Sequence, residues 1–329
     1  MNERCDESCA AVSLDAAVNA ARGVPIPLPA VERAMPAVRR IAWGVVLALG
    51  ITLLLWASAF TAIRVAVREF DPGALAFFRN SVTALAMLGG ALVWQRDAFR
   101  RLRRADLLPL IAAGVIGIAL YQLSLITGEE SVDAGTASLI INTSPIITAL
   151  LARRLLQEHL GLRGWIGVLL GFAGAALLIT GRHGGAHLEL GGLFVLVAAS
   201  AQSLSFIIQK PLLARLGPYI VTTWVGVAGA VSLFAYGPAL AADLGHISLK
   251  ALASGVYLGL FPAAIGNLTW AYALSRLPAG RASAALYLIA PIATLMSWLL
   301  LDEQPAAQAL LGGAIVIGSV ILVNVRVKK

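Results

Sequence analysis

Long apolar runs dominate the chain, and short clusters of charged residues separate them. A helix needs about twenty apolar residues to cross the hydrocarbon core of a bilayer, and it satisfies its backbone hydrogen bonds internally, as hydrocarbon requires. Ten runs approach that length. The pattern predicts an all-α polytopic membrane protein with ten transmembrane helices, at about residues 41–63, 73–95, 106–127, 134–152, 163–181, 190–209, 218–239, 249–274, 282–301 and 306–325.

The composition excludes a soluble domain. Of the 329 residues, 59% are apolar and 13% are charged, whereas a soluble domain has about 25% charged residues. The net charge of +8 raises the hypothesis of nucleic-acid binding. We reject it, because the basic residues are spread over many short loops and form no continuous stripe for phosphates. Cys5 and Cys9 are the only cysteines, which excludes a disulfide framework and, without further ligands, predicts no metal site and no cofactor.

Lysine and arginine are distributed unevenly over alternate loops. With the N-terminus placed inside the cell, 20 of the 25 basic residues fall on the cytoplasmic side. Arg64, Arg68, Arg182 and Lys250 fall on the outer side, and Arg79 lies within a helix. Cytoplasmic loops carry the excess of positive charge, so we expect both termini in the cytoplasm of a multi-pass protein of a bacterial-type inner membrane. Residues 1–40 lack a long apolar run and are expected to form a flexible cytoplasmic tail.

The two halves of the chain share a motif of proline, Leu-Leu-x-Glu and glycine. Its members are Pro145, Glu158 and Gly167 in the first half and Pro291, Glu303 and Gly312 in the second. Five helices per half is an odd number, so the second copy must enter the membrane in the opposite direction. The sequence thus predicts two inverted five-helix repeats, at 41–182 and 190–325, with the substrate site near the midplane between them. The second proline lies one residue nearer to its glutamate, which rotates that helix end by about 100° and leaves the equivalence of the two glutamates open.

Further motifs are Leu55-Trp-Ala-Ser-Ala-Phe60, Phe77-Phe-Arg79 and the stretch from Tyr272 to Ser283. Together with the repeated element they resemble the EamA-type transporters of the drug/metabolite transporter superfamily, over about residues 41–325. The resemblance implies a carrier rather than an enzyme, for amino acids, nucleosides, other metabolites or xenobiotics, moved mainly outward. We therefore expect an exporter of a small, amino-acid-like metabolite that works by alternating access, with xenobiotic or multidrug efflux as the alternative.

Arg79 is the most informative single residue, because a cation within a span is costly and usually faces a cavity or a partner. In one interpretation it attracts a carboxylate or phosphate of the substrate near the outer mouth. In the other it extends to the interface or pairs with Glu69 or Asp71.

Uncharged polar and aromatic residues inside the predicted spans are the other candidates for substrate contact. With Arg79, the predicted substrate-binding set is Trp56, Tyr121, Asn142, Gln202, Phe206, Asn267, Trp270 and Tyr287. The alternative for each of them is a hydrogen bond or packing contact between helices, which is common in membranes. Pro145 and Pro291 lie at corresponding places in the two repeats and are predicted hinges, or else static kinks.

Deep within the predicted spans the sequence places no Asp, Glu, His or Lys. Proton-coupled carriers usually keep an ionisable group in the pathway, so exchange or facilitated export is at least as well supported as proton coupling. A membrane-embedded enzyme is a distant alternative, because His183, His187 and Glu189 in a glycine-rich loop are the only near-cluster of ligand residues. The expected partners are thus a small-molecule substrate and the lipid bilayer, with no nucleic acid.

Overall fold

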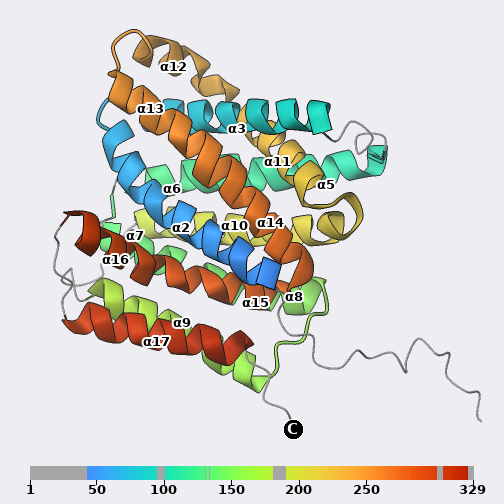
Figure 1. Ribbon diagram of the computed structural model, residues 1–329, viewed down its shortest axis with the longest axis vertical. Coiled ribbons are helices and arrows are strands. Elements are labelled where there is room, and N and C mark those ends of the chain that lie inside the picture. Colours follow the sequence, from blue (N-terminus) through green and yellow to red (C-terminus); the bar gives the residue numbers. More distant parts are fainter. Residues whose placement is uncertain are drawn as a thin grey trace, which may run out of the picture. The chain divides into compact units, whose positions relative to one another are not determined.

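The computed structural model describes residues 43–94, 101–129, 131–132, 134–180, 190–301 and 307–324. Across these residues the secondary structure is helical, with no strand. The expected tail at residues 1–40, together with Glu303, His183, His187 and Glu189, lies outside the described residues. Figure 1 shows the helices coloured along the chain, from blue to red.

The described residues of the first half form seven α-helices and one π-helix. They are α2 (Trp43–Ala66), α3 (Pro72–Trp94), α5 (Arg104–Gly114), the π-helix η1 (Val115–Leu120), α6 (Tyr121–Glu129), α7 (Ala134–Ile141), α8 (Ser144–Leu155) and α9 (Leu162–Thr180). Those of the second half are α10 (Leu190–Leu216), α11 (Pro218–Ser232), the 3-10 helix η2 (Phe234–Tyr236), α12 (Gly237–Asp243), α13 (Leu249–Leu258), the π-helix η3 (Gly259–Gly266), α14 (Asn267–Arg276), α15 (Ala279–Ala284), the 3-10 helix η4 (Ala285–Leu288), α16 (Ile289–Leu301) and α17 (Ala307–Asn324).

Five continuous helical segments of the described chain are long and apolar enough to cross a membrane. They are Trp43–Ala66, Pro72–Val93, Arg104–Glu129, Leu190–Leu216 and Leu249–Arg276. A sixth span is possible if α11 and the bent continuation Phe234–Asp243, which turns by 51°, are taken together. Shorter apolar helices occupy Leu162–Leu177, Ala279–Leu295 and Leu310–Asn324. The structure therefore agrees with a polytopic membrane protein, while the count of ten and the direction of the termini stay predictions.

Two of the predicted spans are interrupted. The span expected at 134–152 is divided into α7 and α8 by a turn at Asn142 and Thr143. Pro145 lies in the first turn of α8, because it has no N–H to continue the hydrogen bonding of α7. Pro291 is the third residue of α16, just after the 3-10 turn η4. Both prolines thus follow a break, rather than kinking a continuous helix from within.

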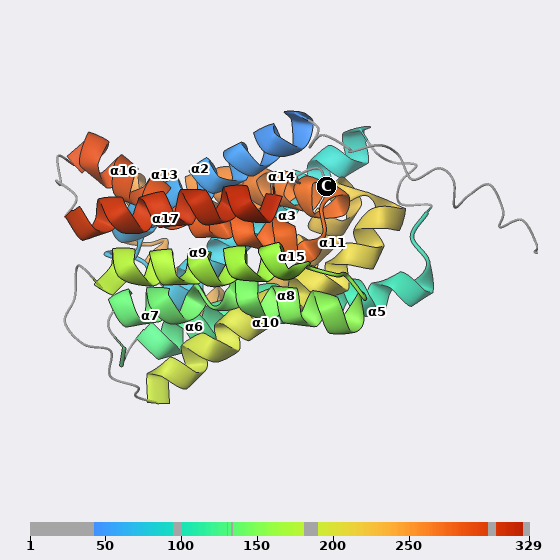
Figure 2. The ribbon, with the colours of Figure 1, turned by 90° about the horizontal axis from the view of Figure 1, so that it is seen from below.

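Helix pairs at equivalent positions of the two halves pack against each other. α17 packs on α9, α11 on α3, and α15 on α8; α9 and α17 run side by side in both views (Figures 1 and 2). The backbones approach closely at Gly174, where a Cβ atom would come within 2.9 Å of the Gly312 carbonyl oxygen. Small residues allow such close packing of membrane helices.

The outer surface of the bundle carries large apolar side chains. Leu47, Leu85, Leu193 and Ile321 are each more than half exposed, and an exposed apolar belt of this kind suits a lipid environment. Buried polar residues lie inside, and most of them bond to backbone carbonyls. Thr52, for example, donates to the Ala48 carbonyl at 2.9 Å and meets the Thr269 hydroxyl at 2.7 Å.

Candidate substrate site

Three of the predicted contact residues form one aromatic cluster. Trp56 of α2 and Phe206 of α10 both pack on Trp270 of α14, with ring centroids 5.8 Å and 4.9 Å away. Trp270 is 2% exposed and Phe206 is 7% exposed. The cluster therefore joins one helix from the first half to two from the second, in the interior of the bundle.

The π-helix η3 holds Trp56 in place. The Trp56 indole Nε1 donates a hydrogen bond to the Pro262 carbonyl at 3.1 Å. Gly266 leaves room for the indole, because a Cβ atom there would lie 2.8 Å from Nε1. π-Helical turns are rare and occur frequently at functional sites.

Trp270 has a buried donor without a partner. Within the described part of the chain its Nε1–H finds no hydrogen-bond acceptor. An unsatisfied buried donor costs about 1–3 kcal/mol. The side chains of its ring neighbours Phe206 and Trp56 contain no oxygen that could accept this hydrogen bond.

The other π-helix, η1, packs against α10. The contact includes Ser205 of α10, which directly precedes Phe206 of the aromatic cluster. Ser205 donates to the Ala113 carbonyl at 2.8 Å and accepts from Gln209 Nε2 at 2.9 Å. Gly117 allows this contact, because a Cβ atom there would lie 2.1 Å from Ser205 Oγ. Sequence analysis did not select Ser205 or Gln209, and neither of them stands out from other polar residues of apolar helices.

The turn between α7 and α8 is fixed to α10 by side chains. Ser144 Oγ donates to Gln202 Oε1 at 3.3 Å and contacts Ser203 Oγ at 3.1 Å, while Ser203 donates to the Ser144 carbonyl at 3.0 Å. Asn142 Nδ2 donates within the turn to the Ser138 carbonyl at 2.7 Å. The structure thus brings Gln202 to the break beside Asn142, and it adds Ser203, which the sequence analysis missed although it directly follows a predicted residue.

Arg79 lies in α3, half-buried, and its Nε is buried without a hydrogen-bond partner among the described residues. Neither acidic residue considered for it is engaged with it. Glu69 accepts from the Ser248 backbone and hydroxyl at 2.5 Å and 2.8 Å, and Asp71 accepts from the Ala74 N–H at 3.0 Å. Tyr121, another predicted contact, is the first residue of α6 and directly follows the π-helix η1.

The remaining predicted residues differ in position. Asn267 is the first residue of α14, half-buried, and precedes Trp270 by three residues, so the two share a helix face. Tyr287 lies apart from the aromatic cluster, fully buried in a group with Ala175 and Val316. Its ring fills the space above Gly171 of α9. The structure therefore places Tyr287 in the packing between η4, α9 and α17.

A network around Lys210 joins α10 to the connection between α14 and α15 and to the segment after α8. The span predicted at 190–209 ends one residue before Lys210, whereas in the structure the helix continues, so Lys210 lies within α10, whose last residue is Leu216. Its Nζ donates to the Leu274 carbonyl at 2.5 Å and to the Leu277 carbonyl, and it lies 3.7 Å from Glu158 Oε1. The other carboxylate oxygen of Glu158 accepts from the Ala279 N–H at 2.5 Å.

This network, which we call the Lys210 latch, comprises Lys210, Glu158, the carbonyls of Leu274 and Leu277 and the N–H of Ala279. The ammonium lies at the C-terminal end of α14 and the carboxylate at the N-terminal end of α15, and each charge is favourable at that helix end. A second ion pair joins Arg215 of α10 to Asp106 of α5.

The opposite end of the bundle has its own tether between the halves. The two hydrogen bonds from Ser248 at the start of α13 hold the pKa of the exposed Glu69 carboxyl below its ordinary value. The Asp71 N–H also donates to Asp243 Oδ2 at 2.8 Å. Among the described residues, no group of three His, Cys, Asp or Glu side chains is placed to hold a metal ion.

The fold matches that of a solved protein. A crystal structure superposes with a TM-score of 0.71 at 19% sequence identity, covering 84% of this chain and 95% of that one. At this identity the likeness speaks for the fold alone.

Two bacterial relatives match most of the chain. One, named "Probable terminal-alkyne amino-acid exporter", from Streptantibioticus cattleyicolor, is 38% identical over 282 residues, or 85% of this chain and 93% of the relative. Another, named "Uncharacterized transporter YdfC", from Bacillus subtilis, is 33% identical over 277 residues, or 84% of this chain and 89% of the relative. Both names are those of transporters rather than enzymes. The model of the EamA-like transporter family matches residues 42–180 and again 189–325. The chain therefore belongs to the EamA-like transporter family and is a multi-pass membrane protein.

Proposed function

We propose that this transporter exports a small, amino-acid-like metabolite across a bacterial inner membrane by alternating access. The proposal divides the chain into a first five-helix repeat at residues 41–182 and a second, inverted repeat at 190–325, with ten spans and both termini in the cytoplasm. In such carriers the substrate binds near the midplane between the repeats, and the repeats rock to admit it from one face at a time.

Matched irregularities support the two repeats. The third predicted span of each half changes from α-helix to π-helix midway, at η1 and at η3. The fourth is interrupted in each half, at Asn142–Thr143 and at η4, and a proline follows each interruption. A two-fold relation between the halves would bring equivalent helices together. The observed pairs are α9 with α17, α3 with α11 and α8 with α15.

The main observation in support of the substrate site is that Trp270 Nε1, inside the aromatic cluster, has no hydrogen-bond partner among the described residues. A substrate oxygen would satisfy this donor, and the rings of Trp56 and Phe206 would cover an apolar side chain. Arg79, with its buried and unpaired Nε, supplies a cation for the carboxylate of an amino-acid-like compound. The name of the Streptantibioticus relative, an amino-acid exporter, supports the same class.

The Lys210 latch supports the alternating mechanism. It joins α10 to the α14–α15 connection and to the segment after α8, at the end of the bundle that the positive-inside distribution assigns to the cytoplasm. Such a contact would stabilise a state closed to the cytoplasm, and its release would allow a substrate to enter from inside. Exchange or facilitated export needs no deeper titratable group.

Multidrug efflux is the second candidate. The aromatic cluster favours it, because three aromatic rings in mutual contact also suit flat apolar compounds of varied structure. The two candidate functions differ in whether the substrate must carry a carboxylate group.

Reconstituted vesicles loaded with labelled amino acids, nucleosides and aromatic cationic drugs test the proposal. We expect efflux of amino-acid-like compounds, and Trp270→Phe should lower it about fivefold to tenfold below saturation, since it removes one hydrogen bond and keeps an aromatic ring. The matched control is Trp43→Phe, because Trp43 is 87% exposed at the start of α2. Efflux of the drugs alone would favour the second candidate, and unchanged amino-acid efflux in Trp270→Phe would remove Trp270 from the substrate site.

A further inference from the structure

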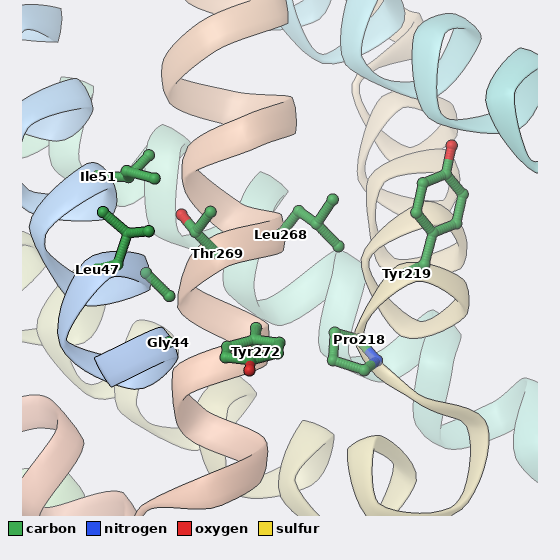
Figure 3. A pocket seen from close by; sticks show the side chains of 9 residues that line it. Gly44, Leu47, Ile51, Pro218, Tyr219, Leu268, Thr269 and Tyr272 are labelled. Atoms are coloured by element: carbon green, nitrogen blue, oxygen red, sulfur yellow. The ribbon is translucent and has the colours of Figure 1, made fainter. Parts of the chain in front are cut away.

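An apolar groove opens between α2, α11 and α14 (Figure 3). Its volume is about 420 Å³. The residues that line it are Gly44, Leu47, Ala48, Ile51, Pro218, Tyr219, Leu268, Thr269 and Tyr272. Leu47 on one wall is 65% exposed, so the groove lies on the outer surface of the bundle.

Two of the hydroxyl groups in the walls, those of Tyr219 and Thr269, are already bonded within the protein. The Tyr219 hydroxyl donates to the Met87 carbonyl at 3.0 Å, and the Thr269 hydroxyl bonds to Thr52 Oγ1 at 2.7 Å and to the Ile265 carbonyl at 3.0 Å. A ligand in the groove therefore meets a hydrocarbon surface, and a hydrophilic metabolite would lose its hydration there without compensation.

A fixed positive charge marks one end of the groove. The Arg276 guanidinium carbon lies 3.6 Å from the ring centroid of Tyr272, a wall residue, and Arg276 is exposed. Its Nη1 also donates to Ser275 Oγ at 3.1 Å. The ion pairs found among the described residues are Lys210–Glu158 and Arg215–Asp106, and Arg276 belongs to neither.

The predicted spans, which begin at about residue 41 and end at about residue 274, place the charged end near the membrane interface. Trp43, the first residue of α2, is almost fully exposed one residue before the groove begins at Gly44. Tryptophan is enriched at the interface between lipid and water. Gly44 gives room to the Tyr272 side chain, because a Cβ atom there would lie 3.0 Å from the Tyr272 hydroxyl oxygen. Apolar walls below and an arginine at headgroup level are complementary to an anionic phospholipid.

We propose that this groove binds an anionic phospholipid of the cytoplasmic leaflet. One acyl chain lies against Leu47, Ile51 and Leu268, and the phosphate lies beside Arg276. The leaflet follows from the predicted orientation, in which the start of α2 and the end of α14 face the cytoplasm, where anionic lipids are concentrated. The groove touches α2 and α14, which carry Trp56 and Trp270, so a bound lipid would support the helices that form the aromatic cluster.

Native mass spectrometry of the full-length protein tests the site, with phosphatidylglycerol and phosphatidylcholine of identical chains added in equal amounts. We expect phosphatidylglycerol to be retained about fivefold more than phosphatidylcholine, the effect of one basic residue near an anionic headgroup. Arg276→Gln should abolish this preference, and Arg276→Lys should largely keep it. The matched control is Arg153→Gln, an exposed arginine on α8 that does not line the groove.

A second variant tests the acyl chain. Leu268→Trp should fill the groove and lower the retention of both lipids, while Leu85→Trp, at an exposed position of α3 outside the groove, should not. Equal retention of the two lipids by the wild type, or an unchanged preference in folded Arg276→Gln, would overturn the proposal. Displacement of bound phosphatidylglycerol by a transported metabolite would overturn it as well, since it would make the groove a substrate portal. Size-exclusion chromatography of each variant establishes that the protein is folded.

Discussion

Replacing Lys210 with methionine should weaken the closure of the bundle at its predicted cytoplasmic end. Methionine keeps most of the apolar stem but cannot donate to the carbonyls of Leu274 and Leu277 or pair with Glu158. The Ala279 N–H keeps its bond to Glu158, so the variant removes the ammonium contacts alone.

The size of the effect follows from these contacts. A hydrogen bond to a charged group contributes about 1.5–3 kcal/mol when buried, and an exposed ion pair contributes about 0–1 kcal/mol. The side chains of Lys210 and Glu158 are 17% and 19% exposed, so we discount the sum for partial solvation to about 2 kcal/mol. That amount shifts the ratio of closed to open states about 30-fold toward the open state.

Thiol labelling measures the shift. Ala149 of α8 is 2% exposed and packs on α15, where a Cβ atom at Gly280 would lie 3.3 Å from that of Ala149. In a background with Cys5→Ser and Cys9→Ser, we introduce Ala149→Cys and apply a membrane-impermeant maleimide to the cytoplasmic face of inside-out vesicles. Adding Lys210→Met should raise the labelling rate about 30-fold if opening is fast relative to labelling.

Lys250→Met is the matched control, because Lys250 is an exposed lysine at the start of α13, on the side opposite to the Lys210 latch in the predicted topology. Its labelling rate should equal that of the parent. A folded Lys210→Met protein that labels at the parental rate would refute the reasoning, because the ammonium contacts would then contribute nothing to closure.

Three further outcomes are expected. Arg79→Gln should lower the efflux of carboxylate compounds more than the efflux of neutral ones. Transport assays at matched expression measure both. An equal loss for the two classes that follows protein abundance would make Arg79 a structural residue. Tags at either terminus should report the cytoplasm and a tag at Gly184 the outside, and a cytoplasmic signal at Gly184 would contradict the ten-helix topology. Because the pKa of Glu69 is lowered in the folded state, its tether to Ser248 is present above the ordinary value of 4.5 and is lost as the pH falls through the lower folded value. Hydrogen exchange at the Ser248 amide should thus differ between the wild type and Glu69→Gln at neutral pH, and the difference should vanish in acid. A difference that is independent of pH would contradict the hydrogen bonds between Glu69 and Ser248.

The sequence predicted much of the fold because hydrocarbon imposes a simple rule on helices. The predicted spans at about 41–63, 73–95, 106–127, 190–209 and 249–274 correspond to the five long helical segments of the structure. Trp56, Phe206 and Trp270, selected as candidates for substrate contact, are joined in one cluster, and their contact with substrate stays a prediction. The repeat register singled out Pro145 as a hinge or kink within a continuous span, and the structure instead has a break just before it, since a proline cannot continue the hydrogen bonding of the preceding helix.

The remainder depended on tertiary contacts that no local pattern contains. The π-helices η1 and η3 have apolar sequences like those of their α-helical neighbours. The role of Gly117 and Gly266 depends on the side chains that pack on them, which the local sequence does not reveal. The predicted span ended before Lys210 because a charge usually ends an apolar run. In the structure its acceptors are the carbonyls of Leu274 and Leu277 at the end of α14, more than sixty residues later in the chain. Tyr287 and Trp270 are both aromatic residues of predicted spans, and only the rotation of each helix determines that Trp270 joins the cluster and Tyr287 packs on Gly171.

Counterflow in reconstituted vesicles tests the central claim, export by alternating access, most directly. Vesicles are loaded with a high concentration of an unlabelled amino-acid-like compound and diluted into a trace of the same compound in labelled form. A carrier that exposes one site to each face in turn predicts a transient accumulation of label above its equilibrium level, which Trp270→Phe reduces and Trp43→Phe leaves intact. Label that only equilibrates, for every compound that the protein moves, would contradict the account.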